Sequence, residues 1–184
     1  MKIKTGRNQT KSISTKIVLI MVAMILIITV LISAFSVIKH REEVISLKIE
    51  QAEDIGQITA SYINGQRFAD LAMADQSDLY YFELKQLLAH FKEVSEVAYL
   101  YAVVPEPDEN KIRFIAEGQA SWDNSEDIYD NNYLVEYADF FVSEDQAEPF
   151  LGAVDNGENF LVGMYQDPDF GHLLTVCTPI VDVY

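Results

Sequence analysis

IVLIMVAMILIITVLISAFSVI, residues 17–38, is a run of 22 residues without a charged side chain. As an α-helix it spans roughly 33 Å, which matches the hydrocarbon core of a bilayer. A helix pairs its own backbone groups, so the run predicts a transmembrane helix. Lys2, Lys4, Arg7, Lys11 and Lys16 precede it without one acid. This asymmetry predicts a single pass through the cell (inner or plasma) membrane with the N-terminus in the cytoplasm.

The charge distribution divides the chain into three parts. Residues 1–16 form a cytoplasmic basic leader, residues 17–38 the transmembrane helix, and residues 39–184 an extracytoplasmic domain. The first 38 residues carry a net charge of +5 and the remaining residues −21. Such an acidic domain repels phosphate backbones, so nucleic acid is excluded as a partner. The transmembrane helix makes the lipid bilayer an expected partner.

A cleavable signal peptide is the alternative interpretation of the apolar run. Ala34-Phe35-Ser36 places small residues at the spacing that a signal peptidase requires. The run is longer than a typical signal core, however, and no turn-forming residue precedes this site. Either interpretation places residues 39–184 outside the cytoplasm.

Helical periodicity continues from Lys39 to about Asp70. Apolar residues recur at steps of three and four, and Asn64-Gly65 predicts a break. The stripe can pack on its own domain or on the same helix of a second copy, so a homodimer through residues 39–70 is a possible partnership. The stripe consists of Ile45, Ile49, Ala52, Ile55, Thr59 and Ile63.

A second helix is predicted over Asp78–Lys92, after which the pattern changes to that of strands. Its expected apolar face is Leu79, Phe82, Leu87, Leu88 and Phe91. The predicted strands are residues 97–104, 111–116, 160–164 and 173–179. A hairpin loop is predicted over 105–110, a long loop over 118–132 and a short helix over 133–142. The fold class is therefore α+β.

No pattern of catalytic or metal-ligating residues stands out. Cys177 is the one cysteine and lies in an apolar run, as a buried cysteine does. His40, His90 and His172 occur in unrelated contexts without metal-ligand spacing. We therefore expect no enzyme activity, no metal and no cofactor.

Several segments, taken in order, resemble the extracytoplasmic Cache (PAS-like) sensor domains of bacterial transmembrane receptors. Lys11-Ser-Ile-Ser-Thr-Lys16 is similar to the start of methyl-accepting chemotaxis proteins. The other segments are Asn64-Gly-Gln-Arg-Phe68, Asp78-Leu-Tyr-Tyr81, Tyr99-Leu-Tyr101, Phe114-Ile-Ala-Glu-Gly118 and Gly171 to Asp182. The resemblance implies a PAS-like antiparallel sheet, and we expect this chain, which stops at Tyr184, to lack the last strand.

The resemblance also implies a function. The chain is expected to be the ligand-sensing input portion of a signal-transduction receptor, most like a chemotaxis receptor. The alternatives are the input domain of a diguanylate cyclase, histidine kinase or phosphatase, or a membrane-tethered binding module without output. The implied ligand is a small molecule of the amino-acid, amine or carboxylate class. The expected ligand-binding residues are Tyr101, Glu117, Tyr133, Tyr165 and Asp167.

Overall fold

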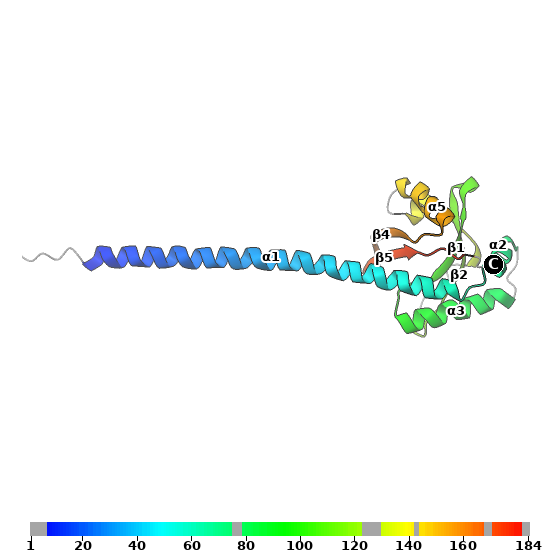
Figure 1. The fold of residues 1–184 in the computed structure, drawn as a ribbon, viewed down its shortest axis with the longest axis horizontal. Coiled ribbons are helices and arrows are strands. Elements are labelled where there is room, and N and C mark those ends of the chain that lie inside the picture. Colours follow the sequence, from blue (N-terminus) through cyan, green and yellow to red (C-terminus); the bar gives the residue numbers. More distant parts are fainter. Residues whose placement is uncertain (1–6, 75–78, 123–129, 142–143, 168–170, 182–184) are drawn as a thin grey trace, which may run out of the picture. The chain divides into compact units, whose positions relative to one another are not determined.

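The computed structural model describes residues 7–74, 79–122, 130–141, 144–167 and 171–181 (Figure 1). By its internal contacts the chain forms two compact units, Met1–Leu47 and Lys48–Tyr184. Helix α1, Arg7–Ser61, begins in the first unit and ends in the second.

The first unit consists of the N-terminal part of α1. Its described side chains from Ile13 to Val44 are exposed, including the whole uncharged run. In the described part of the chain, α1 is the one helix that is long and apolar enough to cross a membrane. The predicted helix over residues 17–38 is thus confirmed, and it is compatible with a transmembrane span.

The predicted break at Asn64-Gly65 is also confirmed. Helix α1 ends at Ser61, and α2 begins at Gly65 and ends at Met73. Asn64 caps α2, because its side-chain oxygen accepts a hydrogen bond from the backbone N–H of Arg67 at 2.9 Å. The predicted stripe is buried at Thr59 on α1 and at Ile63 just after the helix, whereas Ile58 is 51% exposed.

Helix α3, Leu79–Ser95, confirms the second predicted helix, but its predicted apolar face was partly wrong. Leu79 is 74% and Phe82 56% exposed. The buried positions are Tyr81 and four residues spaced four apart, Tyr80, Leu84, Leu88 and Lys92, so they include polar side chains. Tyr80 and Lys92 can be buried because their polar groups have partners, the backbone oxygen of Asn64 and the carboxylate of Glu117. A pattern of apolar residues does not reveal such a face.

Three antiparallel strands form the first sheet, in the order β1-β2-β3. They are β1, Tyr101–Glu106, β2, Lys111–Glu117, and β3, Asp130–Glu136. The predicted hairpin between β1 and β2 is confirmed, with a 3₁₀ turn at Pro107–Glu109 and Asn110 in the left-handed conformation. Strand β1 begins four residues later than predicted.

The helix predicted over residues 133–142 was wrong. Tyr133 to Glu136 belong to β3, which pairs with β2, and only Tyr137–Phe140, α4, are helical. Tyr133-Leu-Val135 are suited to a pleated sheet, and the partner strand decides the conformation of this segment.

The second sheet consists of β4, Phe160–Asp167, and β5, Gly171–Cys177, which pair antiparallel. These strands confirm the two predicted near the C-terminus. A 3₁₀ turn, Glu144–Gln146, and helix α5, Ala147–Asn156, precede them and were not predicted. The described chain is therefore α+β, as expected.

The core of the second unit lies on both faces of β2. Ile115 and Ala116 pack with α2 and α3, whereas Ile112 and Phe114 pack with α4 and α5. Ala102 pairs with Ala116 but Val103 pairs with Phe114, so Ile115 is an extra residue in β2. This bulge lets the adjacent residues Ile115 and Ala116 face the same core, whereas adjacent residues of a regular strand point to opposite faces.

Candidate functional site

A cavity of about 560 Å³ lies within the second unit. Its walls come from the C-terminal end of α1, from α2, from β1, from α5 and from the segment that runs from β5 to Val181. Such a volume suits a small organic ligand or a short piece of chain.

The α1 wall is built from small residues. Gly56, Thr59 and Ala60 leave space beside the helix, and Ile63, two residues after the helix ends, also lines the cavity. The Thr59 hydroxyl donates to the carbonyl oxygen of Ile55 at 2.7 Å, which satisfies this buried group within its own helix. The wall is thus apolar in character.

Segment 178–181 passes close to α1 at Gly56. A Cβ added to Gly56 would collide with the Thr178 side chain, so only glycine allows this approach. The Thr178 hydroxyl is buried and has no hydrogen-bond partner among the described residues.

Charged groups occupy one side of the cavity. Arg113 on β2 and Glu106 at the end of β1 form an ion pair at 2.5 Å, and their side chains are 23% and 30% exposed. Nearby Tyr137 is buried, and this burial raises the pKa of its hydroxyl, with a further increase from the negative charge of Glu106.

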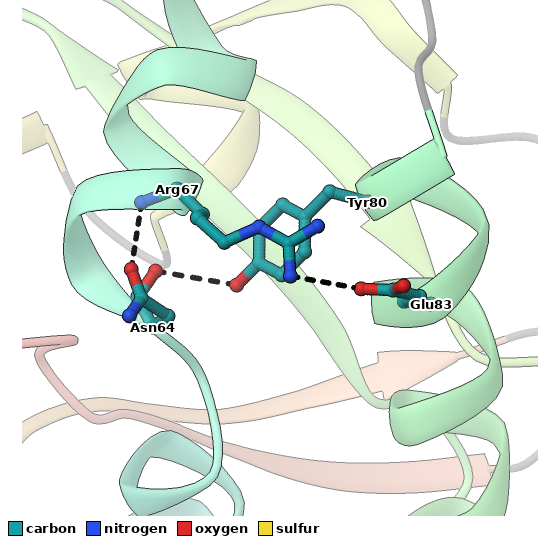
Figure 2. A network of polar contacts seen from close by, with 4 residues as sticks. All are labelled: Asn64, Arg67, Tyr80 and Glu83. Carbon is teal, nitrogen blue, oxygen red and sulfur yellow. Dashed lines mark hydrogen bonds and ion pairs between the residues drawn. The ribbon is translucent and has the colours of Figure 1, made fainter.

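A polar network fixes α2, which forms another wall (Figure 2). Tyr80 on α3 donates to the backbone oxygen of Asn64 at 3.2 Å. The Arg67 guanidinium lies over the Tyr80 ring, 4.1 Å from its centroid, and pairs with Glu83 at 3.0 Å. The network links α2 to α3 and holds the end of the α1–α2 connection.

No family model, curated protein or solved structure matches the chain.

Of the five expected ligand-binding residues, Tyr101 is the one whose described side chain lines the cavity. Its ring contacts Phe114 in a T-shaped arrangement with centroids 5.0 Å apart. Glu117 is opposite Tyr101 in the β1–β2 register. Tyr165 lies on β4 and is 37% exposed. Tyr133 and Asp167 lie on β3 and β4, but their side chains are outside the described part.

Glu117 forms a buried ion pair instead of facing the cavity. The Lys92 ammonium lies 3.5 Å from its carboxylate, and their side chains are 0% and 4% exposed. The rings of Tyr99 and Trp122 lie on the same ammonium, each with its centroid at 5.6 Å. The group joins the end of α3 to the end of β2.

Sequence reasoning missed Arg113, Glu106 and the cavity wall on α1. Arg113 alternates with Ile112 and Phe114, a pattern that indicated only a half-buried strand. Gly56 carried no signal, because a single glycine in a helical pattern has no defined role. Among the described residues, no group of three or more His, Cys, Asp or Glu side chains is placed to hold a metal ion.

Proposed function

We propose that the chain is the ligand-sensing input portion of a transmembrane signal-transduction receptor, most like a chemotaxis receptor. One observation carries the proposal: α1 contains the uncharged run and also supplies Gly56, Thr59 and Ala60 to the cavity wall. A ligand in the cavity therefore contacts the same helix that, in this proposal, enters the membrane. The N-terminus of the chain then lies in the cytoplasm. A ligand that binds two positions of this helix with different affinity shifts their populations.

The chemistry of the cavity supports a ligand of the amino-acid, amine or carboxylate class. Arg113 presents a guanidinium suited to a carboxylate, and Glu106 a carboxylate suited to an ammonium group. Tyr101 adds an aromatic wall with a hydroxyl. The resemblance to Cache sensor domains favours the same ligand class.

Ligand binding is tested on the full chain in lipid nanodiscs, by thermal shift and calorimetry with amino acids, amines and organic acids. Arg113→Gln should weaken binding of a carboxylate ligand by about tenfold or more, because a charge-assisted hydrogen bond is lost. Lys111→Gln is the matched control, since Lys111 is on the same strand and does not line the cavity. Equal loss in both variants would contradict the assignment.

Sensing, as opposed to binding, requires a response in α1. A cysteine introduced at Lys39, just after the uncharged run, should react with a membrane-impermeant maleimide at a rate that changes with ligand. Burial raises the pKa of the native Cys177 thiol to about 12, so it contributes little background. A ligand that binds without changing this rate would identify a tethered binding module and refute the sensor.

The type of output is part of the proposal. A chemotaxis receptor is the form favoured by residues 11–16, and diguanylate cyclases, histidine kinases and phosphatases are the alternatives. Fused after Tyr184, a reporter that works only outside the cytoplasm should be active, and one that works only in the cytoplasm should be inactive. Activity of cytoplasmic reporters there would overturn the membrane topology on which the proposal depends.

A further inference from the structure

Most of the cavity wall is apolar. Helix α2 contributes Phe68 and Ala72, helix α5 contributes Phe150 and Val154, and strand β5 contributes Val176. The volume of about 560 Å³ lies within the range in which proteins bury drug-sized ligands, and acetate or glycine would fill only a small part of it. A ligand that fills the cavity therefore places a large apolar body against these walls.

The charged groups of the wall define where the polar end of such a ligand lies. Among the described residues that line the cavity, the charged ones are Glu106, Arg113 and Glu158. Glu158 is exposed to solvent, whereas Arg113 and Glu106 are partly buried and paired, with 2.5 Å between Nη2 and Oε1. The Arg113–Glu106 pair is thus the polar end of the cavity.

The pair leaves one hydrogen-bond donor of Arg113 without an acceptor. A guanidinium carries five N–H donors, and the Nε–H of Arg113 is buried with no partner among the described residues. A buried donor without an acceptor is unfavourable, so a ligand that supplies one gains affinity. The Thr178 hydroxyl in the cavity wall is also buried and unpartnered, but a hydroxyl both donates and accepts, so it does not select a ligand class. Arg113 selects an acceptor.

We infer that the ligand of this cavity is a monocarboxylate with a large apolar body, of the aromatic or medium-chain type. Its carboxylate binds the Arg113 guanidinium, and its body lies against the apolar walls. The Nε atom is covered by protein, so the guanidinium turns toward the cavity as the carboxylate binds, which a side chain that is 23% exposed has room to do. The inference rests on the proposed sensor function and narrows the ligand class of the same site.

The other two ligand classes fit this polar end less well. An amine would compete with Arg113 for the carboxylate of Glu106 and leave a partly buried guanidinium without its counter-charge. An amino acid would bring its ammonium group close to the same guanidinium, where like charges repel. Five donors, in contrast, allow Arg113 to bind a second carboxylate while it keeps its contact with Glu106.

The test compares three ligands that share one apolar body. Phenylbutyrate, its neutral amide and phenylbutylamine are titrated calorimetrically into the full chain in lipid nanodiscs, and nanodiscs without protein correct for partitioning into the bilayer. Phenylbutyrate should bind at least about tenfold more tightly than the amide, because the amide lacks the charge-assisted hydrogen bond. Phenylbutylamine, acetate and phenylalanine should also bind at least about tenfold more weakly than phenylbutyrate.

Variants assign the carboxylate to Arg113 and the apolar body to the cavity. Arg113→Gln should weaken binding of phenylbutyrate by about tenfold and leave binding of the amide unchanged, which also shows that the cavity is still folded. Glu106→Gln should tighten binding of phenylbutyrate several-fold, because a like charge is removed. Lys111→Gln, outside the cavity on the same strand, should change neither affinity. Ala60→Leu, which fills the cavity, should abolish binding of the acid and the amide, and Gln57→Leu, outside the cavity on α1, should not.

Three results would overturn the inference. The first is equal affinity for phenylbutyrate and its amide. The second is equal loss of both ligands in a folded Arg113→Gln variant, or weaker binding of the acid in Glu106→Gln. The third is an amino acid or amine that binds when phenylbutyrate does not, which would leave the sensor function standing. If no ligand of the three classes bound, both the inference and the proposed function would fail.

Discussion

Lys92 and Glu117 form an ion pair inside the second unit, with the ammonium nitrogen 3.5 Å from the carboxylate oxygen and both side chains almost fully excluded from solvent. The pair connects α3 to β2, which carries the cores on both faces of the first sheet. A charge buried with its partner is tolerated, but one left without it is strongly unfavourable.

Lys92→Met should therefore destabilise the domain by about 3 kcal/mol, because the buried carboxylate of Glu117 loses the opposing charge of the ammonium group. Lys92→Met combined with Glu117→Leu should recover most of this loss. Denaturant unfolding measures both. Lys111→Met is the control, since its contact with Glu109 is 3.9 Å long and exposed, and its cost should be under about 1 kcal/mol. If the losses of unfolding free energy for Lys92→Met and Glu117→Leu simply added in the double variant, the two side chains would not be coupled.

Gly118→Ala should destabilise the domain by about 1–3 kcal/mol. Gly118 is buried, and an added Cβ would collide with the backbone of Leu88 and Ala89 on α3, which cannot move aside as a side chain can. Gly152→Ala is the matched control on α5. No atom lies within 4 Å of a Cβ at Gly152, so the helix should gain about 0.5–1 kcal/mol. Equal effects would show that the contact with α3 is unimportant.

Cys177 should resist alkylation in the native state. Burial raises its pKa from 9.0 to about 12, so at pH 8 the thiolate is far scarcer than in the unfolded chain. Labelling of the folded protein should be slower on the order of a hundredfold or more than in denaturant. The raised pKa contributes stability that is complete below pH 9 and is lost as the pH rises toward 12. Rapid labelling at neutral pH would contradict this burial.

Asn64→Ala should cost about 1 kcal/mol, because the side chain that caps α2 is lost, whereas Asn64→Ser should cost little. The backbone contact from Tyr80 remains in both variants. Glu83→Gln should cost less than about 1 kcal/mol, since the Arg67–Glu83 pair is half exposed. Thermal unfolding ranks the three, and a larger loss for Glu83→Gln would reverse the assigned order.

A homodimer through the long helix makes a separate prediction. Ile58 near the end of α1 and Tyr62 just after it are 51% and 68% exposed, so they form an apolar surface suited to a second copy. Ile58→Glu should lower the dimer fraction of the full chain measured by mass photometry in nanodiscs, and Gln57→Glu should not. An unchanged distribution with Ile58→Glu would refute this interface.

Local patterns in the sequence predicted much of the fold. The predicted apolar stripe included Thr59 and Ile63, which are buried, and Asn64-Gly65 predicted the break that follows α1. Residues 133–136 were mistaken for helix because their conformation depends on pairing with β2, which lies far earlier in the chain. Whether a short apolar segment of this kind forms a helix or a strand depends on the strand that it can pair with.

The candidate site was harder to predict. Tyr101 was named correctly as a sheet residue and lines the cavity. Glu117 was expected to bind ligand, yet it pairs with Lys92, 25 positions away. A lysine in a helical pattern is usually solvated, and no local spacing indicates that it will be buried beside a distant carboxylate.

The glycine at position 56 has a consequence for how α1 can move. One turn away in either direction lie Ala52 and Ala60, each with a methyl group where Gly56 has none. If α1 slid by a turn, one of these methyl groups would arrive at the side chain of Thr178, and if it turned about its axis, Ile55 or Gln57 would. Gly56 therefore defines a single axial register for the helix, a resting position from which any displacement has a steric cost.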